Sequence, residues 1–264
     1  TGTTTILAAG DITASGAVAF GAVKSGTLTT SGDIDTSNDN VTFTRAVTLG
    51  GNVDIDTTGS SDGNILFSST IATAGNNLTL DAGTAGNVTL SGALTGGGAM
   101  TVRDGEVQSY AVLTVDSLTI SDATTSVTLG GALTADGAVD IDSGGTIAIN
   151  AAINTNSSAS GTVAIDGDGT TTIAAAGDIN AGGAVSFGAA KSGTLTTSGD
   201  IVTSNDNITF TRAVTLGGNV DIDTTGGSAG NILFSAAIAT GGNNLVLVAG
   251  TAGNVTLAGA LTGK

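Results

Sequence analysis

The chain contains a near copy of itself. Residues 10–97 match residues 177–264 at a constant offset of 167, with 15 differences over 88 paired positions. Repeat architectures stack units of roughly 20 to 50 residues, each unable to bury its apolar face alone. The long period is therefore expected to contain smaller units. We predict one continuous array, with a first copy at 10–176 and a partial second copy at 177–264, forming a fragment of a longer chain.

A shorter repeat lies inside the long one. Segments that start with an aliphatic residue and run into a Gly-rich turn recur, for example from Val47, Ile71, Leu94, Leu113 and Leu133. Cutting the period at such points gives rungs of 17, 20, 24, 23, 19, 20, 20 and 24 residues, which fill all 167 positions. This division predicts eight rungs per period and about twelve rungs in the 264-residue chain.

Each rung carries the alternation of short strands. Val53 and Ile55 alternate with Asp54 and Asp56, the period of two that turns successive side chains to opposite faces. The runs end in clusters of Gly, Asn, Asp, Ser and Thr, which form turns, and 43 glycines disfavour helix. The sequence predicts an all-β fold, a right-handed parallel β-helix or β-solenoid with three short strands per rung. About twelve rungs at ~4.8 Å would extend about 55 to 60 Å.

Like residues should stack on like residues in such a coil. Phe43 and Phe67 occupy matching third-strand positions, as do Phe210 and Phe234, and the columns should continue through the residues Leu90 and Leu257. We interpret them as internal stacks, because six Phe, one Tyr and no Trp are a poor basis for a ligand-binding platform.

Asparagines precede many of the predicted strands, at positions 40, 52, 64, 77 and 87. Asparagine tolerates left-handed backbone geometry and can form hydrogen-bonded ladders between stacked chains. Some of them, with their equivalents in the second copy, also lie in N-x-[ST] sequons, namely Asn40, Asn77, Asn87, Asn207 and Asn254. We favour turn ladders over glycan acceptors.

Composition narrows the function classes. The chain has no Cys, His, Trp or Pro, so aliphatic packing must supply the core without disulfides. A formal charge of −16 argues against nucleic acid and anionic membrane surfaces as partners. No apolar run is long enough for a membrane helix, and no signal peptide is visible.

The rung NNLTLDAGTAGNVTLSGALTGGG at 76–98 resembles the repeats of filamentous-haemagglutinin-like and autotransporter-like surface proteins of bacteria, including giant repetitive β-strand proteins. The resemblance rests on composition and rhythm and covers essentially the whole chain. It implies a secreted or surface-attached rod that serves adhesion, aggregation or an outer coat. It supplies no catalytic residues.

The sequence does not suggest an enzyme. Parallel β-helices that cleave polysaccharides need clustered carboxylates together with Arg, Lys or His as acid, base or charge stabiliser. The six cations here include two pairs that are simply repeat equivalents: they are Lys24, Arg45, Arg103, Lys191, Arg212 and Lys264. We therefore expect no catalytic site and no cofactor.

A calcium-binding adhesin repeat is one alternative function. Asp54 and Asp56, with their equivalents Asp221 and Asp223, should point to one side, and Asp81 should lie near Asp56 one rung away. A second acidic group comprises Asp140, Asp142, Asp166 and Asp168. Carboxylate oxygens suit Ca²⁺, but alternating Asp is also an ordinary way to keep a strand face solvated and prevent association. We favour the solvated face.

An ice-binding β-solenoid is the other alternative, because rows of Thr on a flat face could order water. Thr27, Thr42 and Thr170 start such motifs. The expected outward column is interrupted, however, since it runs Thr48, Ala72, Thr95, Thr114, Thr134, Asn154.

The two copies differ in charge. Asp35, Asp62, Thr79 and Asp81 of the first copy are replaced by Val202, Ala229, Val246 and Val248 in the second. Besides drift, a lateral contact could explain this, with a self-association surface formed by Val202, Leu233, Val246 and Val248. Uncapped rungs would offer end-to-end contacts as well. The overall expectation is an extracellular structural or adhesive rod whose partners are other copies of itself, cell-surface glycans or other cells.

Overall fold

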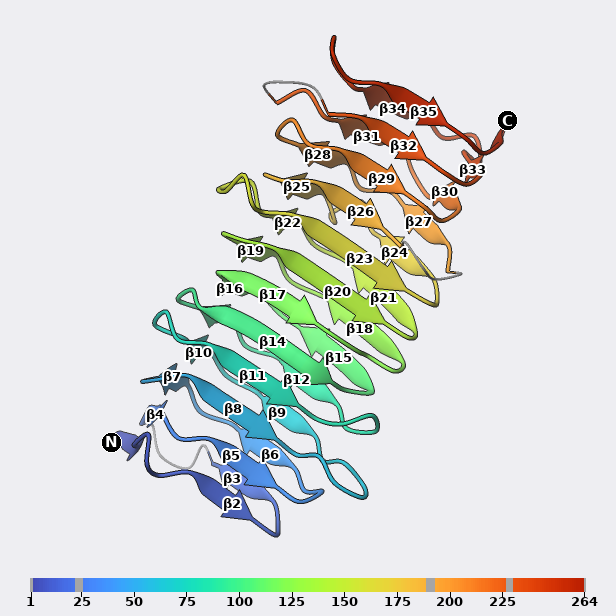
Figure 1. Ribbon diagram of the computed structural model, residues 1–264. Coiled ribbons are helices and arrows are strands. Elements are labelled where there is room, and N and C mark those ends of the chain that lie inside the picture. The colour runs from blue at the N-terminus through green and yellow to red at the C-terminus, as the bar shows by residue number, and fades with distance from the viewer. Residues whose placement is uncertain (1, 22–25, 189–192, 227–229, 264) are drawn as a thin grey trace.

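The computed structural model describes residues 2–21, 26–188, 193–226 and 230–263. Over these residues the chain is an all-β solenoid with no helix, built from three parallel sheets of twelve strands each. The strands pile up rung upon rung, and β1 and β36 lie at opposite ends of the stack (Figure 1). The predicted parallel β-solenoid with three short strands per rung is confirmed. None of the described elements is a helix that could cross a membrane.

Sheet A takes the first strand of each rung. Its strands, in spatial order, are β1 (Thr4–Ile6), β4 (Leu28–Thr30), β7 (Val47–Leu49), β10 (Ile71–Ala72), β13 (Leu94–Thr95), β16 (Leu113–Val115), β19 (Leu133–Ala135), β22 (Ile153–Asn154), β25 (Ile179–Ala181), β28 (Ile201–Thr203), β31 (Val220–Asp223) and β34 (Leu245–Val248).

Sheet B takes the second strand and contains the longest strands. Its order is β2 (Ile12–Ala14), β5 (Ile34–Thr36), β8 (Val53–Asp56), β11 (Leu78–Asp81), β14 (Ala99–Asp104), β17 (Ser117–Ile120), β20 (Val139–Ser143), β23 (Val163–Gly167), β26 (Val185–Phe187), β29 (Ile208–Phe210), β32 (Ile232–Phe234) and β35 (Val255–Leu257).

Sheet C takes the third strand. Its order is β3 (Val18–Phe20), β6 (Val41–Phe43), β9 (Ile65–Phe67), β12 (Val88–Leu90), β15 (Val107–Tyr110), β18 (Ser126–Leu129), β21 (Thr146–Ile149), β24 (Thr171–Ile173), β27 (Leu195–Thr197), β30 (Val214–Leu216), β33 (Ile238–Ala239) and β36 (Leu261–Thr262).

Alternation along each strand separates core from surface. In β8, Val53 and Ile55 are buried while Asp54 and Asp56 are half-buried on the outer side. The alternation continues past the strand: the next inward residue is Thr57, which is fully buried and donates its hydroxyl to the carbonyl of Gly63 at 2.6 Å. Inward threonines thus satisfy loop carbonyls at the corners, which a purely aliphatic core could not do.

The phenylalanines form stacks inside the solenoid. Phe43 and Phe67 are in register and stacked, with ring centroids 4.3 Å apart, and Phe20 extends the stack at 5.0 Å. Phe210 and Phe234 repeat the 4.3 Å stack in the second copy. Phe187 extends this stack, with its ring centroid 5.1 Å from that of Phe210. The predicted internal columns are confirmed, and each holds one ring more than the sequence analysis assigned.

The two stacks do not lie in one sheet. Phe43 and Phe67 belong to sheet C, whereas Phe210 and Phe234 belong to sheet B. The same change affects every equivalent strand: β2 in sheet B starts the first copy, and β25, 167 residues later, lies in sheet A. The second copy is therefore turned by one face around the rod axis relative to the first.

The cause is the number of strands in a period. From β2 to β25 the described chain passes 25 − 2 = 23 strands, which is seven rungs and two strands. The prediction of eight rungs per period was wrong, because the described part of its shortest rung, residues 10–21 and 26, contains two strands, β2 and β3, and the next strand, β4, returns to sheet A. Alternation and turn residues identify strands, but they do not identify which corner of a rung a turn makes.

Candidate functional surface

Side-chain ladders link neighbouring rungs at the starts of strands. The backbone N–H of Asn64 donates to Asn40 Oδ1 at 2.8 Å, and that of Asn87 donates to Asn64 Oδ1 at 2.8 Å. A separate ladder joins the N–H of Asn77 to Asn52 Oδ1 at 2.9 Å. The predicted ladders are present, and the second copy repeats them through Asn207, Asn219, Asn231, Asn244 and Asn254.

The sequence analysis linked the ladder asparagines to left-handed backbone geometry. In the structure none of them has a positive φ. Among the described residues other than glycine, positive φ occurs at Asn38, Ala74 and Asn205. At the ladder positions the amide oxygen accepts the backbone N–H of the next rung. Left-handed geometry is instead needed inside the loops, where Asn38 has φ of 79° and its repeat equivalent Asn205 has φ of 93°.

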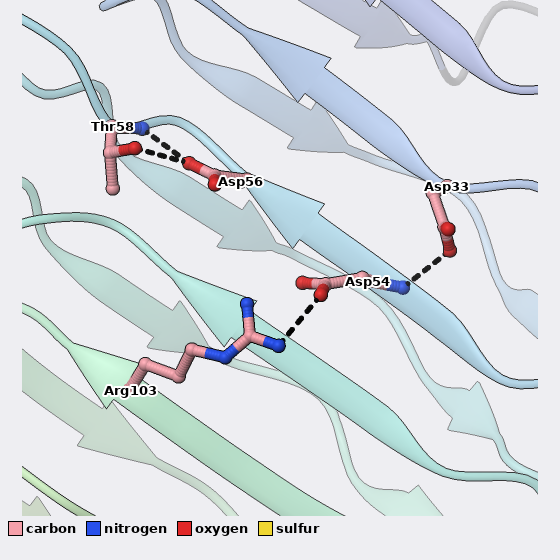
Figure 2. Close-up of polar contacts among 5 residues, drawn as sticks. All are labelled: Asp33, Asp54, Asp56, Thr58 and Arg103. Atoms are coloured by element: carbon pink, nitrogen blue, oxygen red, sulfur yellow. Dashed lines mark hydrogen bonds and ion pairs between the residues drawn. The ribbon is translucent and has the colours of Figure 1, made fainter.

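Aspartates form a third ladder, on sheet B. The N–H of Asp33 donates to Asp11 Oδ1 at 3.0 Å, and the N–H of Asp54 donates to Asp33 Oδ1 at 2.8 Å (Figure 2). In the second copy Asp178, Asp200 and Asp221 make the same contacts, at 2.9 and 2.8 Å. These carboxylates accept backbone hydrogen bonds, as the ladder asparagines do, which the sequence analysis did not anticipate.

The carboxylate of Asp54 is paired with an arginine from two rungs away. Asp54 Oδ2 lies 2.9 Å from Arg103 Nη2 (Figure 2). Burial raises the pKa of Asp54, and Arg103 opposes that shift. Arg103 reaches this place because it is the extra residue between Val102 and Asp104, where the register of β14 against β11 shifts. Such a bulge redirects a side chain, and the sequence contains no signal that fixes its position.

The carboxylate of Asp56 is used within its own loop. Asp56 Oδ1 accepts hydrogen bonds from both N and Oγ1 of Thr58, each at 2.7 Å (Figure 2). In the second copy Asp223 accepts from Thr225 in the same way, at 2.7 and 2.6 Å. Local capping of this kind stabilises turns and uses acceptor capacity that a cation would require.

Four aspartates stack in one outward column of sheet B. The register places Asp35, Asp56, Asp81 and Asp104 on successive rungs. The expected neighbourhood of Asp81 and Asp56 is thus present, and in the second acidic group Asp142 pairs with Asp166. Among the described residues, however, no group of three or more potential ligands is gathered closely enough to hold a metal ion.

In the second copy this column is partly apolar. Val202, Asp223 and Val248 follow one another in sheet A, and Val246 neighbours Asp221. The two Asp-to-Val changes therefore remove the charges on both sides of Asp223. Leu233 lies in sheet B, so the structure gathers Val202, Val246 and Val248 on one face and places Leu233 on another. Ala229 is outside the described residues.

Two shallow depressions occur at equivalent places in the two copies. One, of about 260 Å³, is lined by Asp33, Asn52, Val53, Asp54, Asn77 and Thr79. The other, of about 280 Å³, is lined by Asp200, Asn219, Val220, Asp221, Asn244 and Val246. They lie over β8 and β11 of sheet B and over β31 and β34 of sheet A. Ladder residues form most of each lining, and Val246 makes the second one less polar.

Two other arginines also connect distant rungs. Arg45 Nη1 donates to Thr4 Oγ1 at 3.1 Å, and its equivalent Arg212 donates to Thr171 Oγ1 at 3.0 Å, each across 41 residues. Arg212 is only 4% exposed, and Asp166 Oδ1 lies 3.6 Å from its Nη2. Burial lowers the pKa of Arg212. The cations Lys24, Lys191 and Lys264 lie outside the described residues.

Over the described residues, the outward threonine column of sheet A is not continuous. In sheet A the outward residues Thr29, Thr48, Ala72 and Thr95 are in register, so the column is interrupted where expected. Thr171, from one of the motifs that suggested ice binding, is fully buried.

No match was found when the chain was compared with known protein families, with curated proteins and with solved structures.

Proposed function

We propose that this chain is a segment of an extracellular structural or adhesive rod, and that its sequence encodes a shape. One observation carries the proposal: the rungs stack without interruption through three parallel sheets of twelve strands over the described residues. Eleven steps between twelve strands, at ~4.8 Å each, give a stack about 53 Å long. Each rung is stabilised by contact with its neighbours, as in solenoids that present an extended surface.

The use of the polar side chains supports the same proposal. Amides and carboxylates at strand starts accept backbone N–H groups from the next rung. The three arginines reach two rungs away, to Thr4, Asp54 and Thr171. A catalytic site would instead direct an acid, a base and a charge stabiliser towards one point. The groups that could do chemistry here are distributed along the axis and hold rungs together.

The net negative charge of the chain is compatible with the proposed role as a rod outside the cell. A rod with a net charge of −16 stays soluble and resists unspecific association. Self-association through the face bearing Val202, Val246 and Val248, or end to end, and contacts with cell-surface glycans are parts of the proposal. The resemblance to bacterial surface repeats supports an extracellular setting.

Imaging and an activity assay together test the proposal. Small-angle scattering and electron microscopy of the purified chain should show stiff rods, and material at high concentration should contain assemblies longer than one chain. Incubation with acidic and neutral polysaccharides should release no reducing ends and no unsaturated sugars. Arg103→Ala is the control for trace activity, because Arg103 is 51% exposed beside a carboxylate. Cleavage by the chain that Arg103→Ala abolishes would overturn the structural role.

A further inference from the structure

Charge is distributed unevenly over the three sheets. The strands of sheet C contain no charged residue, whereas sheet A contains Asp221 and Asp223 in β31. Sheet B carries Arg103 and most of the strand aspartates, namely Asp35, Asp54, Asp56, Asp81, Asp104, Asp140, Asp142 and Asp166. The outward positions of sheet C hold Thr, Ser and Ala together with Leu66 and Val107. Over the described strands, sheet C is therefore a neutral face on a chain with a net charge of −16.

Exposed apolar side chains lie on the same face. Away from the first and last rungs, the described residues expose large apolar side chains at Val107, which is 38% exposed, and at Val112, which is 43% exposed. Val107 begins β15 of sheet C, and Val112 follows this strand at the corner towards sheet A. Leu66 is half-buried in the outward column of Ser109, two rungs away. Apolar side chains grouped on an uncharged face mark an interaction surface.

We propose that two copies of this chain associate side by side through sheet C. Two chains of net charge −16 repel each other most where carboxylates face carboxylates, and the aspartates of sheet B would do so. Two copies that meet through sheet C avoid this repulsion, because neither sheet C carries a charge. A basic partner would instead be attracted to sheet B, so the neutral face suits a second copy better. This inference rests on the self-association in the proposed function and deepens it by assigning it a face.

The position of the apolar side chains favours one arrangement of the two copies. A two-fold axis parallel to the rods gives an isologous interface in which each rung lies against the same rung of the second copy. Because this axis reverses the strand direction, Val107 would lie opposite Val112 of the second copy, and Ser109 would lie near its own counterpart. Rods in antiparallel orientation would instead place β15, the fifth strand of sheet C, against β24, the eighth. There the outward residue is Thr172, which gives no apolar match.

The size of the face indicates how strong the contact is. Twelve strands at ~4.8 Å spacing extend about 53 Å, and three residues at ~3.3 Å span about 10 Å. The footprint is therefore about 500 Å² before the corner residues are added, compared with about 800 Å² per partner in a standard stable interface. We expect a reversible dimer with a dissociation constant in the micromolar range.

Single cysteines test which face is in contact, because the chain has no Cys of its own. Ser109→Cys places a thiol near the centre of the proposed interface. Thr101→Cys is the matched control, because Thr101 is equally half-buried and outward on β14, in sheet B of the same rung. Under mild oxidation, Ser109→Cys should form a disulfide-linked dimer at least about tenfold faster than Thr101→Cys, since thiols held opposite each other have a raised effective concentration. Equal rates for the two variants would overturn the proposal.

Sedimentation equilibrium of charge variants provides an independent test. Ser109→Asp places two carboxylates against each other and should raise the dissociation constant of the dimer at least about tenfold. Thr114→Asp adds the same charge at an exposed position of sheet A and should leave the dissociation constant unchanged in 0.15 M salt, which screens charges beyond ~8 Å. Circular dichroism melting curves establish that both variants are folded.

The outcomes separate this proposal from the proposed function. An equal effect of Ser109→Asp and Thr114→Asp, or an unmodified chain that stays monomeric at high concentration, would overturn the contact through sheet C. If Ser109→Asp assembled as readily as the unmodified chain, the contact would lie at the rod ends or on sheet A, and the proposed function would stand. Scattering that showed no stiff rod would count against the proposed function itself.

Discussion

Phe43 and Phe67 stack face to face in the core, their planes inclined by 5° and their ring centroids 4.3 Å apart. Leu90 follows Phe67 in the same column of sheet C, so the ring of Phe67 is enclosed from both sides along the axis. Aromatic contacts of this kind add to the free energy of simple burial. The column makes the stability of one rung depend on its neighbours.

Phe67→Ala is therefore expected to lower the free energy of unfolding by about 3 to 5 kcal/mol, as large-to-small changes in a core do. Chemical denaturation monitored by circular dichroism measures the change. Phe20→Ala is the matched control, because Phe20 has a stacked partner on one side and is only half-buried. If both variants lost the same free energy of unfolding, enclosure of Phe67 between two neighbours would add nothing to stability.

The core could be predicted because alternation and stacking are visible in the sequence. Val53, Ile55 and Phe67 are buried as their alternation requires. The asparagine ladders also follow from sequence, since one residue type recurs where strands start. The buried Thr57 could have been found by extending the alternation of β8 by one residue.

Other features depend on three-dimensional information. The rotation of the second copy arises because the described residues of the range 10–26 form two strands, β2 and β3. A short rung with three strands would have a similar sequence. The pairing of Arg103 with Asp54 requires a bulge and a distance of two rungs. Both are consequences of register, which a single sequence does not encode in a readable pattern.

A second prediction separates two aspartates of one column. Asp56→Ala removes the acceptor of two hydrogen bonds from Thr58 and should lower the free energy of unfolding by about 1 kcal/mol, since the site is half-buried. Asp35→Ala is the control: Asp35 is exposed and stacks against Asp56 in the same column. It should be neutral or slightly stabilising, because it removes a like charge. The melting temperatures of both variants test this prediction. A larger decrease for Asp35→Ala than for Asp56→Ala would contradict the assigned roles.

A third prediction concerns pH. Burial first, and then the charges of Asp122, Asp81 and Asp62, raise the pKa of Asp104. A raised folded-state pKa means that ionisation opposes folding, so this group favours the fold when protonated and loses that contribution as the pH rises through its folded-state pKa. Acidification from neutral pH towards the ordinary value of 3.8 should therefore increase the stability contributed by Asp104.

Asp104→Asn isolates this contribution, because its Oδ1 can still accept the N–H of Gly105, a bond of 2.8 Å in the structure. The variant should melt at a higher temperature than the unmodified chain at pH 7, and the difference should shrink towards pH 4. Melting curves across this range provide the measurement. A difference that grows on acidification would mean that the charged carboxylate stabilises the fold. Asp62, whose pKa is lowered by backbone hydrogen bonds from the Gly59 and Ala85 amides, acts in the opposite direction in both proteins.

The last prediction sets the rod against calcium-dependent folding. Three of the four aspartates first considered as ligands already use a carboxylate oxygen: Asp56 and Asp223 accept from Thr58 and Thr225, and Asp54 pairs with Arg103. At Asp221 the backbone N–H donates to Asp200 Oδ1. A fold held by backbone ladders and apolar columns should keep its melting temperature in excess chelator and in millimolar Ca²⁺. Arg103→Ala provides the sensitive case, since it frees Asp54 Oδ2 for a cation. If Ca²⁺ raised the melting temperature of the unmodified chain, and the double variant Asp54→Asn with Asp56→Asn abolished the rise, these aspartates would be ligands and the solvated-face interpretation would be wrong.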